Sequence, residues 1–184
     1  MDKKYSKQTI EKLIKTLDKN LKEKIKIIAI GGTALALLNQ RAYSKDIDIC
    51  YLDCKSPIDF AQTVVDTAKE IGIEPRDIEM FHGFEMTLLD FPEFGERATS
   101  YKNLSLRNIE FKIMNTLDIV LSKIHRGNLR DKSDVKKLID EKKIDMISLQ
   151  SRYIDIVKYQ KDLEIRREFI KKYETFIKDI NKKN

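Results

Sequence analysis

Asp46 and Asp48 are separated by one residue in the segment DIDICYL, where acidic and apolar residues alternate, a pattern that predicts a β-strand over residues 46–52. On a strand both side chains project from the same face, with Cα atoms roughly 6.5 Å apart. Two carboxylates at that spacing can converge on Mg²⁺ or Mn²⁺, because hard cations prefer oxygen ligands and share them with substrate phosphates. The pair therefore predicts a divalent-metal site.

Gly31 and Gly32 come before the aspartates, where a predicted strand over residues 25–30 meets a short helix that we expect to begin at Thr33. A backbone without Cβ can approach a phosphate closely, and the N–H groups of a helix start point towards it. Taken singly, D-x-D is typical of exposed strand faces and Gly-Gly of turns. In this order they predict a triphosphate site facing a metal, as phosphoryl-type transfer requires.

These motifs together resemble the nucleotidyltransferase superfamily with the polymerase-β-like minimal fold, whose signature is a Gly-Gly or Gly-Ser turn, a short helix and a D-x-D strand. The likeness is closer to the AbiEii-like toxin nucleotidyltransferases. It spans about residues 25–140 and is carried by GGTALALLNQRAYSKDID, Asp118-IVLS-Lys123 and Arg130-Asp131-KS-Asp134-Val135.

The resemblance implies catalytic roles for individual residues. Asp46 and Asp48 would hold the metal, Lys123 would contact the triphosphate, and Asp131 would complete the catalytic centre. Many members of the wider superfamily place a third acid on a later strand, and Glu110 in NIEFKIM is the candidate metal ligand. The alternatives are structural: Lys123 as an exposed helix lysine, Asp131 as a helix-capping residue, and Glu110 as a half-exposed strand residue.

The same resemblance implies a set of substrate-binding residues. Gly31 and Gly32 would line the phosphate site, with Ser44 as a hydrogen-bond donor or simply a turn residue. Arg41 belongs to the first motif, and Arg130 would add positive charge near the phosphates.

Composition sets the class of protein. The chain has 184 residues and is 41% hydrophobic, which fits one ordinary domain with a helical appendage. We expect a cytoplasmic location and no membrane association, because charged residues interrupt every apolar run and the N-terminus lacks a signal-peptide core.

The charged residues are of both signs: Lys+Arg 36 against Asp+Glu 30 gives a net charge of +6. This charge permits an anionic partner but is equally explained by a Lys-rich surface. Cys50 and Cys54 have no partners for a zinc site, so we expect reduced packing residues.

Hydrophobic periodicity, together with the residues that begin and end helices and turns, predicts the elements that position these residues. We expect an α+β fold, an α/β mixed sheet with a helical C-terminal region, divided into residues 1–115 and 116–184. The predicted strands cover residues 25–30, 46–52, 84–89 and 108–114. The predicted helices cover residues 5–22, 33–40, 57–72 capped by Ser56, 116–126 capped by Thr116, the segment after Gly127-Asn128, and one long or two consecutive helices from Ser148.

The predicted function is Mg²⁺-dependent transfer of a nucleotidyl group from an NTP to an acceptor hydroxyl, on an RNA or tRNA 3′ end or on a protein. If the resemblance extends to biology, the chain is the toxin of a toxin–antitoxin pair, which implies an antitoxin partner. The alternatives are a non-catalytic nucleotide- or RNA-binding module on the same fold, and a helical interaction protein acting through residues 148–184.

Overall fold

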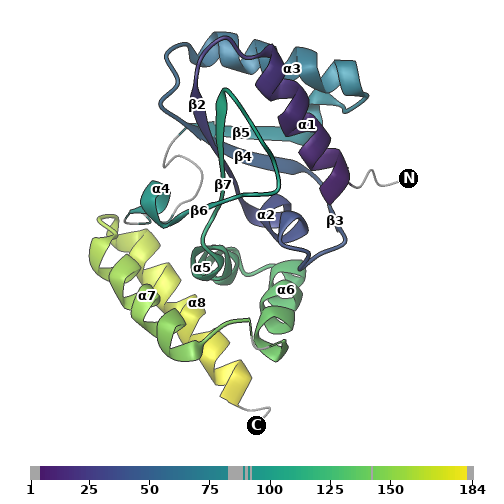
Figure 1. The fold of residues 1–184 in the computed structure, drawn as a ribbon. Helices are drawn as coiled ribbons and strands as arrows, with labels where there is room; N and C mark the ends of the chain where they lie inside the picture. The colour runs from purple at the N-terminus through teal and green to yellow at the C-terminus, as the bar shows by residue number, and fades with distance from the viewer. Residues whose placement is uncertain (1–4, 83–88, 90, 92, 142, 182–184) are drawn as a thin grey trace. The chain divides into compact units, whose positions relative to one another are not determined.

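The computed structural model describes residues 5–82, 89, 91, 93–141 and 143–181, and its contacts divide the chain into two compact units. The first unit comprises Met1–Met86 and Gly95–Met114; the second comprises Thr87–Phe94 and Asn115–Asn184. The first contains the β-sheets and the second is helical, which confirms the predicted α+β class (Figure 1). The strand predicted at 84–89 lies, apart from Leu89, outside the described residues.

The first unit is built on a mixed five-stranded sheet with the order β5-β4-β2-β7-β6. Strand β2 is antiparallel to β4 and parallel to β7, and β4 is parallel to β5. A separate two-stranded sheet pairs β1 with β3. The strands are β1 (Tyr5–Ser6), β2 (Ile25–Ala29), β3 (Tyr43–Ser44), β4 (Ile47–Leu52), β5 (Ile78–His82), β6 (Thr99–Ser100) and β7 (Ile109–Ile113). The helices that accompany them are α1 (Lys7–Asn20), α2 (Gly31–Leu37), α3 (Pro57–Ile71), the 3-10 turn η1 (Pro75–Asp77) and α4 (Phe94–Arg97).

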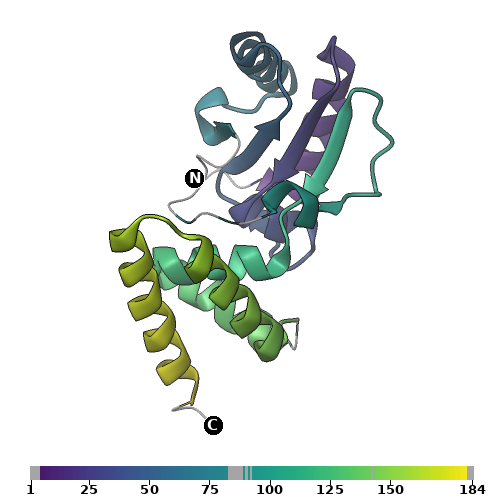
Figure 2. The ribbon, with the colours of Figure 1, turned by 90° about the vertical axis from the view of Figure 1, so that its left-hand side faces the viewer.

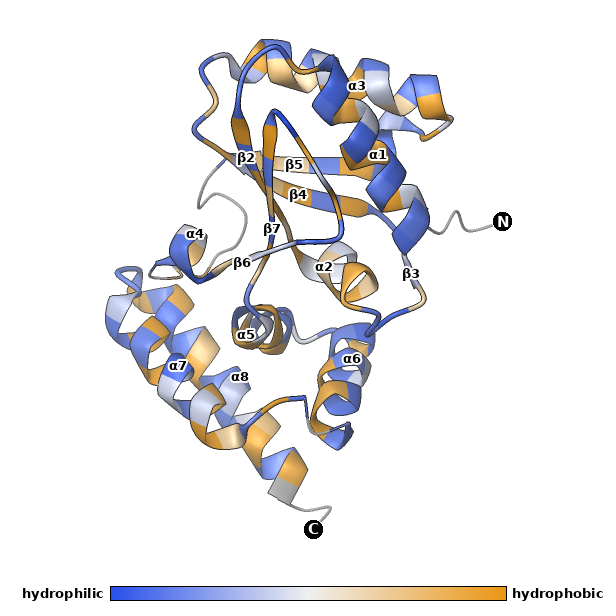
Figure 3. Ribbon diagram, viewed as in Figure 1, coloured by the Kyte–Doolittle hydropathy of each residue, from blue (hydrophilic) through white to orange (hydrophobic). Residues whose placement is uncertain are grey.

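Helices α1 and α3 pack against each other and lie on the same face of the sheet (Figures 1 and 2). Both are amphipathic, and α1 shows alternating hydrophilic and hydrophobic stripes in Figure 3. The predicted caps of α3 are confirmed: the Ser56 hydroxyl accepts from the Asp59 N–H, and Gly72 ends the helix in the left-handed region. Cys50, buried in β4, and Cys54 are both free thiols, as predicted.

A buried carboxylate on α1 fixes the start of β7. Asp18 accepts hydrogen bonds from the backbone N–H groups of Arg107, Asn108 and Ile109, with the two shortest at 2.7 and 2.9 Å. The Asn108 carbonyl in turn accepts from the Ile25 N–H, where β2 begins. The register of β7 beside β2 is therefore set by side-chain and backbone bonds together.

Four helices make up the described residues of the second unit from 115 onward, and α5 contacts each of the other three. The C-terminal periodicity forms two helices rather than one, because the chain leaves the helix at Gln160 and Asp162 accepts from the N–H groups of Glu164 and Ile165. Asn115, not the predicted Thr116, is the N-cap of α5, since its side chain accepts from the Leu117 N–H. The bounds are α5 (Thr116–Arg126), α6 (Leu129–Asp140), α7 (Met146–Tyr159) and α8 (Leu163–Asn181).

No helix within the described ranges combines the length and the apolar character needed to cross a bilayer.

Candidate active site

The two aspartates lie at the start of β4. The strand begins at Ile47, so Asp46 occupies the bend just before it and Asp48 is its second residue; both are partly buried. The Ile30 N–H, at the end of β2, donates to the Asp48 carbonyl at 3.2 Å. The central strand of the sheet thus holds the backbone of Asp48 in place.

Gly31 lies directly against the carboxylate of Asp48. A Cβ built on Gly31 would come within 3.0 Å of Asp48 Oδ2, and Gly31 has a φ of +52°, a left-handed conformation that favours glycine. Helix α2 begins at Gly31, two residues before the expected Thr33, so the glycines that were predicted to open the helix form its first turn. The D-x-D strand therefore faces a stretch of bare backbone.

Gly32 faces two of the predicted substrate-binding side chains. Its Cβ, if present, would lie 2.6 Å from Ser44 Oγ and 3.0 Å from Arg41 Nη1. Ser44 is 3% exposed and is held in β3, where it pairs with Tyr5 of β1. The first unit thus brings together two glycines, one hydroxyl, one guanidinium and one carboxylate.

Thr33 also belongs to this group, although the sequence analysis predicted no role for it other than the start of a helix. Its side chain is fully buried, and its Oγ1 donates to the Asp46 carbonyl at 3.2 Å and accepts from the Asp48 N–H at 2.8 Å. No sequence motif names this contact, because it joins two elements whose approach only the fold determines.

Glu110 is not brought to the aspartates. In β7 it pairs with Lys26 of β2, whereas Asp48 bonds to Ile30, which follows the last residue of β2. Ile30 is four residues beyond Lys26 and hence roughly 13 Å away along the strand direction. The Glu110 carboxylate is instead 3.2 Å from Lys112 Nζ and 55% exposed. That separation is too great for Glu110 and Asp48 to ligate one ion.

The acid that does neighbour the D-x-D strand is Glu79. Strand β5 runs parallel to β4 with Glu79 directly opposite Asp48, so the two side chains lie on the same face of adjacent strands. Glu79 is exposed. Its segment, IEMFH, was not predicted as a strand, and without the β4–β5 register nothing singles it out.

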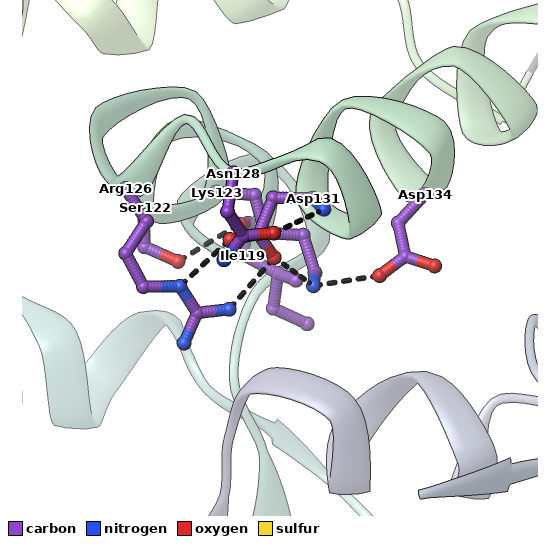
Figure 4. A network of polar contacts seen from close by, with 7 residues as sticks. All are labelled: Ile119, Ser122, Lys123, Arg126, Asn128, Asp131 and Asp134. Carbon is purple, nitrogen blue, oxygen red and sulfur yellow. Dashed lines mark hydrogen bonds and ion pairs between the residues drawn. The ribbon is translucent and has the colours of Figure 1, made fainter. Parts of the chain in front are cut away.

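The second unit holds a separate network around Lys123, which is only 2% exposed (Figure 4). Lys123 Nζ lies 2.8 Å from both Asp131 Oδ1 and Asp134 Oδ2. Arg126 donates to both oxygens of Asp131, Nε at 2.8 Å and Nη2 at 2.7 Å. The alternative that Lys123 is an exposed helix lysine is therefore wrong.

Asp131 is the most enclosed acid of this network, at 2% exposed. Burial by itself raises the pKa of its carboxyl, but the hydrogen bonds from Arg126 and Lys123 outweigh burial and hold that pKa below its ordinary value. Asn128, rather than Asp131, caps α6 by accepting from the Asp131 N–H. The positive charges of Lys123 and Arg126 thus equal in number the negative charges of Asp131 and Asp134.

Residues 7–181 match the DUF6036 family, which is described as a nucleotidyltransferase of unknown function. The chain belongs to this family. No curated protein and no solved structure matches it. The DUF6036 assignment confirms the nucleotidyltransferase superfamily inferred from the motifs, and the closer likeness to AbiEii-like toxins stays a prediction.

The donor set of this DUF6036 protein suits a Mg²⁺ ion that takes only part of its coordination from protein. Asp46 and Asp48 offer hard carboxylate oxygens beside bare glycine backbone, and Mg²⁺ commonly binds one or two carboxylates together with water and substrate phosphates. Within the described part of the chain, no three His, Cys, Asp or Glu side chains gather closely enough to hold a metal by themselves. The residues fit a cation shared with a nucleotide.

The remaining motif residues of the DUF6036 chain lie in the helical unit. Asp118, the first residue of the D-x4-K motif, forms a two-pronged ion pair with Arg152 of α7, Nε to Oδ1 at 2.6 Å and Nη2 to Oδ2 at 3.1 Å. Both side chains are buried. Arg130 is exposed near the start of α6. The structure thus gathers the predicted residues into two groups, one in each unit.

Proposed function

We propose that this protein is a divalent-metal-dependent nucleotidyltransferase that transfers a nucleotidyl group from an NTP to an acceptor hydroxyl. The contact between the Gly31 backbone and the Asp48 carboxylate is the observation that carries the proposal. A phosphate that approaches the glycines arrives beside the carboxylates suited to a cation. Membership of a nucleotidyltransferase family supports the same reaction class.

The chain's own residues would bind and orient the triphosphate. Asp46 and Asp48 would hold Mg²⁺, which when bound neutralises phosphate charge and fixes the reacting oxygens. Arg41 and Ser44, both beside Gly32, would donate hydrogen bonds to phosphate oxygens. A side chain at Gly31 would press on the Asp48 carboxylate, and one at Gly32 would press on the Ser44 hydroxyl and the Arg41 guanidinium.

The transfer itself forms one bond and breaks one. The acceptor oxygen bonds to the α-phosphorus, the bond from that phosphorus to the bridging oxygen breaks, and pyrophosphate leaves. The proton of the acceptor hydroxyl needs a base. We assign that role to Glu79, because its carboxylate lies on the strand next to Asp48 and on the same face.

Lys123 and Asp131 enter the proposal through the resemblance, as the triphosphate contact and as the completion of the catalytic centre. Lys123 already binds two carboxylates. In the structure Lys123 and Asp131 bind each other, and their roles in the transfer rest on the motif resemblance alone.

For the acceptor we propose an RNA 3′ end, including that of tRNA, or a protein hydroxyl. The net charge of +6 permits anionic acceptors such as RNA. The likeness of the motifs to AbiEii-like nucleotidyltransferases further supports a toxin whose activity an antitoxin partner would restrain.

The test incubates the pure protein with each of the four α-labelled NTPs, Mg²⁺ and total RNA, and separates labelled RNA from labelled protein. We expect label from one or more NTPs to transfer in the presence of Mg²⁺ only. Asp46→Asn and Asp48→Asn should each reduce transfer by about 100-fold or more, since each removes a charged ligand from the site. Glu110→Gln is the control and should transfer label like the wild type, because Glu110 lies far along the sheet.

Full activity in both aspartate variants would reject the site. The second candidate function is a non-catalytic nucleotide- or RNA-binding module, favoured by the observation that, within the described residues, no three His, Cys, Asp or Glu side chains lie close enough together to hold a metal. It predicts metal-dependent NTP binding without label on any acceptor.

A further inference from the structure

The Thr33 hydroxyl bridges the backbone on both sides of Ile47. It donates to the Asp46 carbonyl at 3.2 Å and accepts from the Asp48 N–H at 2.8 Å. Thr33 is the third residue of α2 and is fully buried. One side-chain oxygen therefore ties the helix that begins at the glycines to the two residues that carry the candidate metal ligands.

The two bonds restrain a part of the chain that the sheet holds incompletely. Asp46 precedes β4, so its carbonyl lies outside the strand, and the described bond to that carbonyl comes from Thr33. The Asp48 carbonyl is held by the Ile30 N–H and the Asp48 N–H by Thr33. The relative orientation of the two aspartates thus depends on α2 as well as on β2.

We propose that Thr33 is a positioning residue of the metal site, whose hydroxyl sets the separation and direction of the Asp46 and Asp48 carboxylates. The role rests on the proposed function. Mg²⁺ and Mn²⁺ require nearly octahedral oxygen ligands at short distances, so a small rotation of one aspartate backbone removes a ligand. Residues that orient metal ligands typically change metal affinity by about 10- to 100-fold when they are replaced.

Two substitutions separate positioning from packing. Thr33→Val keeps the branched shape and removes the hydroxyl, whereas Thr33→Ser keeps the hydroxyl and removes the methyl group. Thr67→Val is the matched control: Thr67 is also fully buried in the first unit, and its hydroxyl accepts from Asn20 Nδ2 at 3.1 Å rather than touching the aspartates. All three variants change one buried threonine of the same unit.

The experiment measures Mn²⁺ binding to the full chain in the presence of a non-hydrolysable NTP, tried with each of the four bases, by titration with electron paramagnetic resonance. Exchange of the Asp48 amide is measured by NMR in the same variants. We expect Thr33→Val to weaken Mn²⁺ binding about 10-fold or more and to speed Asp48 amide exchange by a similar factor. Thr33→Ser should stay within about 3-fold of the wild type in both measurements, because the serine hydroxyl can make both bonds. Thr67→Val should match the wild type in both.

The positioning role would be overturned if Thr33→Val bound Mn²⁺ with wild-type affinity. It would also be overturned if Thr33→Val and Thr33→Ser lost the same amount of Mn²⁺ affinity. In both cases the metal site itself would stand. A wild type that binds no Mn²⁺ with any of the four NTPs, or binds it unchanged after Asp48→Asn, would overturn the metal site and the role of Thr33 together.

Discussion

At the residue scale, the missing Cβ of Gly31 determines how close the backbone comes to Asp48. The φ of +52° already disfavours any other residue, and a Cβ would press on Asp48 Oδ2 at 3.0 Å. Gly72 offers a comparison, because it also has a left-handed φ, +79°, but nothing lies within 4 Å of its Cβ position. A substitution at Gly72 therefore causes backbone strain alone, whereas a substitution at Gly31 causes backbone strain and also crowds the Asp48 carboxylate.

Gly31→Ala should therefore lose label transfer by about 10-fold or more, because a displaced carboxylate misplaces the metal. Gly72→Ala should keep wild-type transfer. Both variants should lose about 1–2 kcal/mol of unfolding free energy from alanine in the left-handed region. The measurements are initial transfer rates and urea unfolding curves for the two variants. Equal transfer by both would show that Gly31 has no special relation to Asp48.

Residue types and spacing pointed to Gly31, Gly32 and Asp48, and the family resemblance added Arg41 and Ser44, all within one stretch of sequence. Thr33 and Glu79 were beyond that reasoning. Their relation to the aspartates comes from a helix-to-strand hydrogen bond and from strand register, and both are long-range properties of the fold.

At the element scale, amphipathic helices were predicted to within a few residues, as the limits of α3 and α5 illustrate. Short strands were not. β1, β3 and β6 contain two residues each, too few for a periodic pattern to develop. β5 has five residues, as β2 and β7 do, but its sequence IEMFH places two apolar residues, Met80 and Phe81, side by side and so does not alternate. Glu110 was predicted near the metal because its strand was identified without its register.

Helix α5 is the central element of the second unit, and its Asp118–Arg152 pair joins it to α7. Removing one partner of a buried ion pair leaves the other charge uncompensated, which costs about 3–5 kcal/mol. Asp118→Asn should therefore lower the unfolding free energy of the helical unit by that amount, measured by urea unfolding. Replacing both residues with leucine should restore part of the loss, since no buried charge is left behind.

Asp155→Asn is the control for this experiment, because Asp155 is an exposed acid on the same helix as Arg152. It should change the unfolding free energy by no more than about 0.5 kcal/mol. If Asp118→Asn behaved like Asp155→Asn, the ion pair would not hold α5 and α7 together.

At the scale of the whole molecule, the chain has two compact units, and each has its own buried polar groups. His125 belongs to the helical unit, is 6% exposed, and packs edge-on against Phe169. Burial and the nearby Lys172 ammonium lower the pKa of His125, and Glu168 only partly opposes them. Within the described residues, His125 Nε2 has no hydrogen-bond partner that would stabilise the charged ring.

The lowered pKa makes the helical unit sensitive to acid. Above pH 6.5, the ordinary pKa of histidine, the ring is neutral in both folded and unfolded chains, so its contribution to stability is fully present. As the pH falls below that value the unfolded chain takes up the proton first, and stability is lost progressively until the folded pKa is passed. We expect peptides of α5 and α8 to lose hydrogen-exchange protection between pH 7.5 and 5.5, after correction for intrinsic rates.

His125→Gln removes the titrating ring, so exchange protection of α5 and α8 in that variant should vary less with pH than in the wild type. His82→Gln, a change in the first unit, leaves His125 in place and should retain the full wild-type dependence. Peptides of β2 and β4 should respond little, because neither strand contains a histidine and the two units have separate cores. Equal pH dependence in the wild type and in His125→Gln would mean that another group controls the acid response of the helical unit.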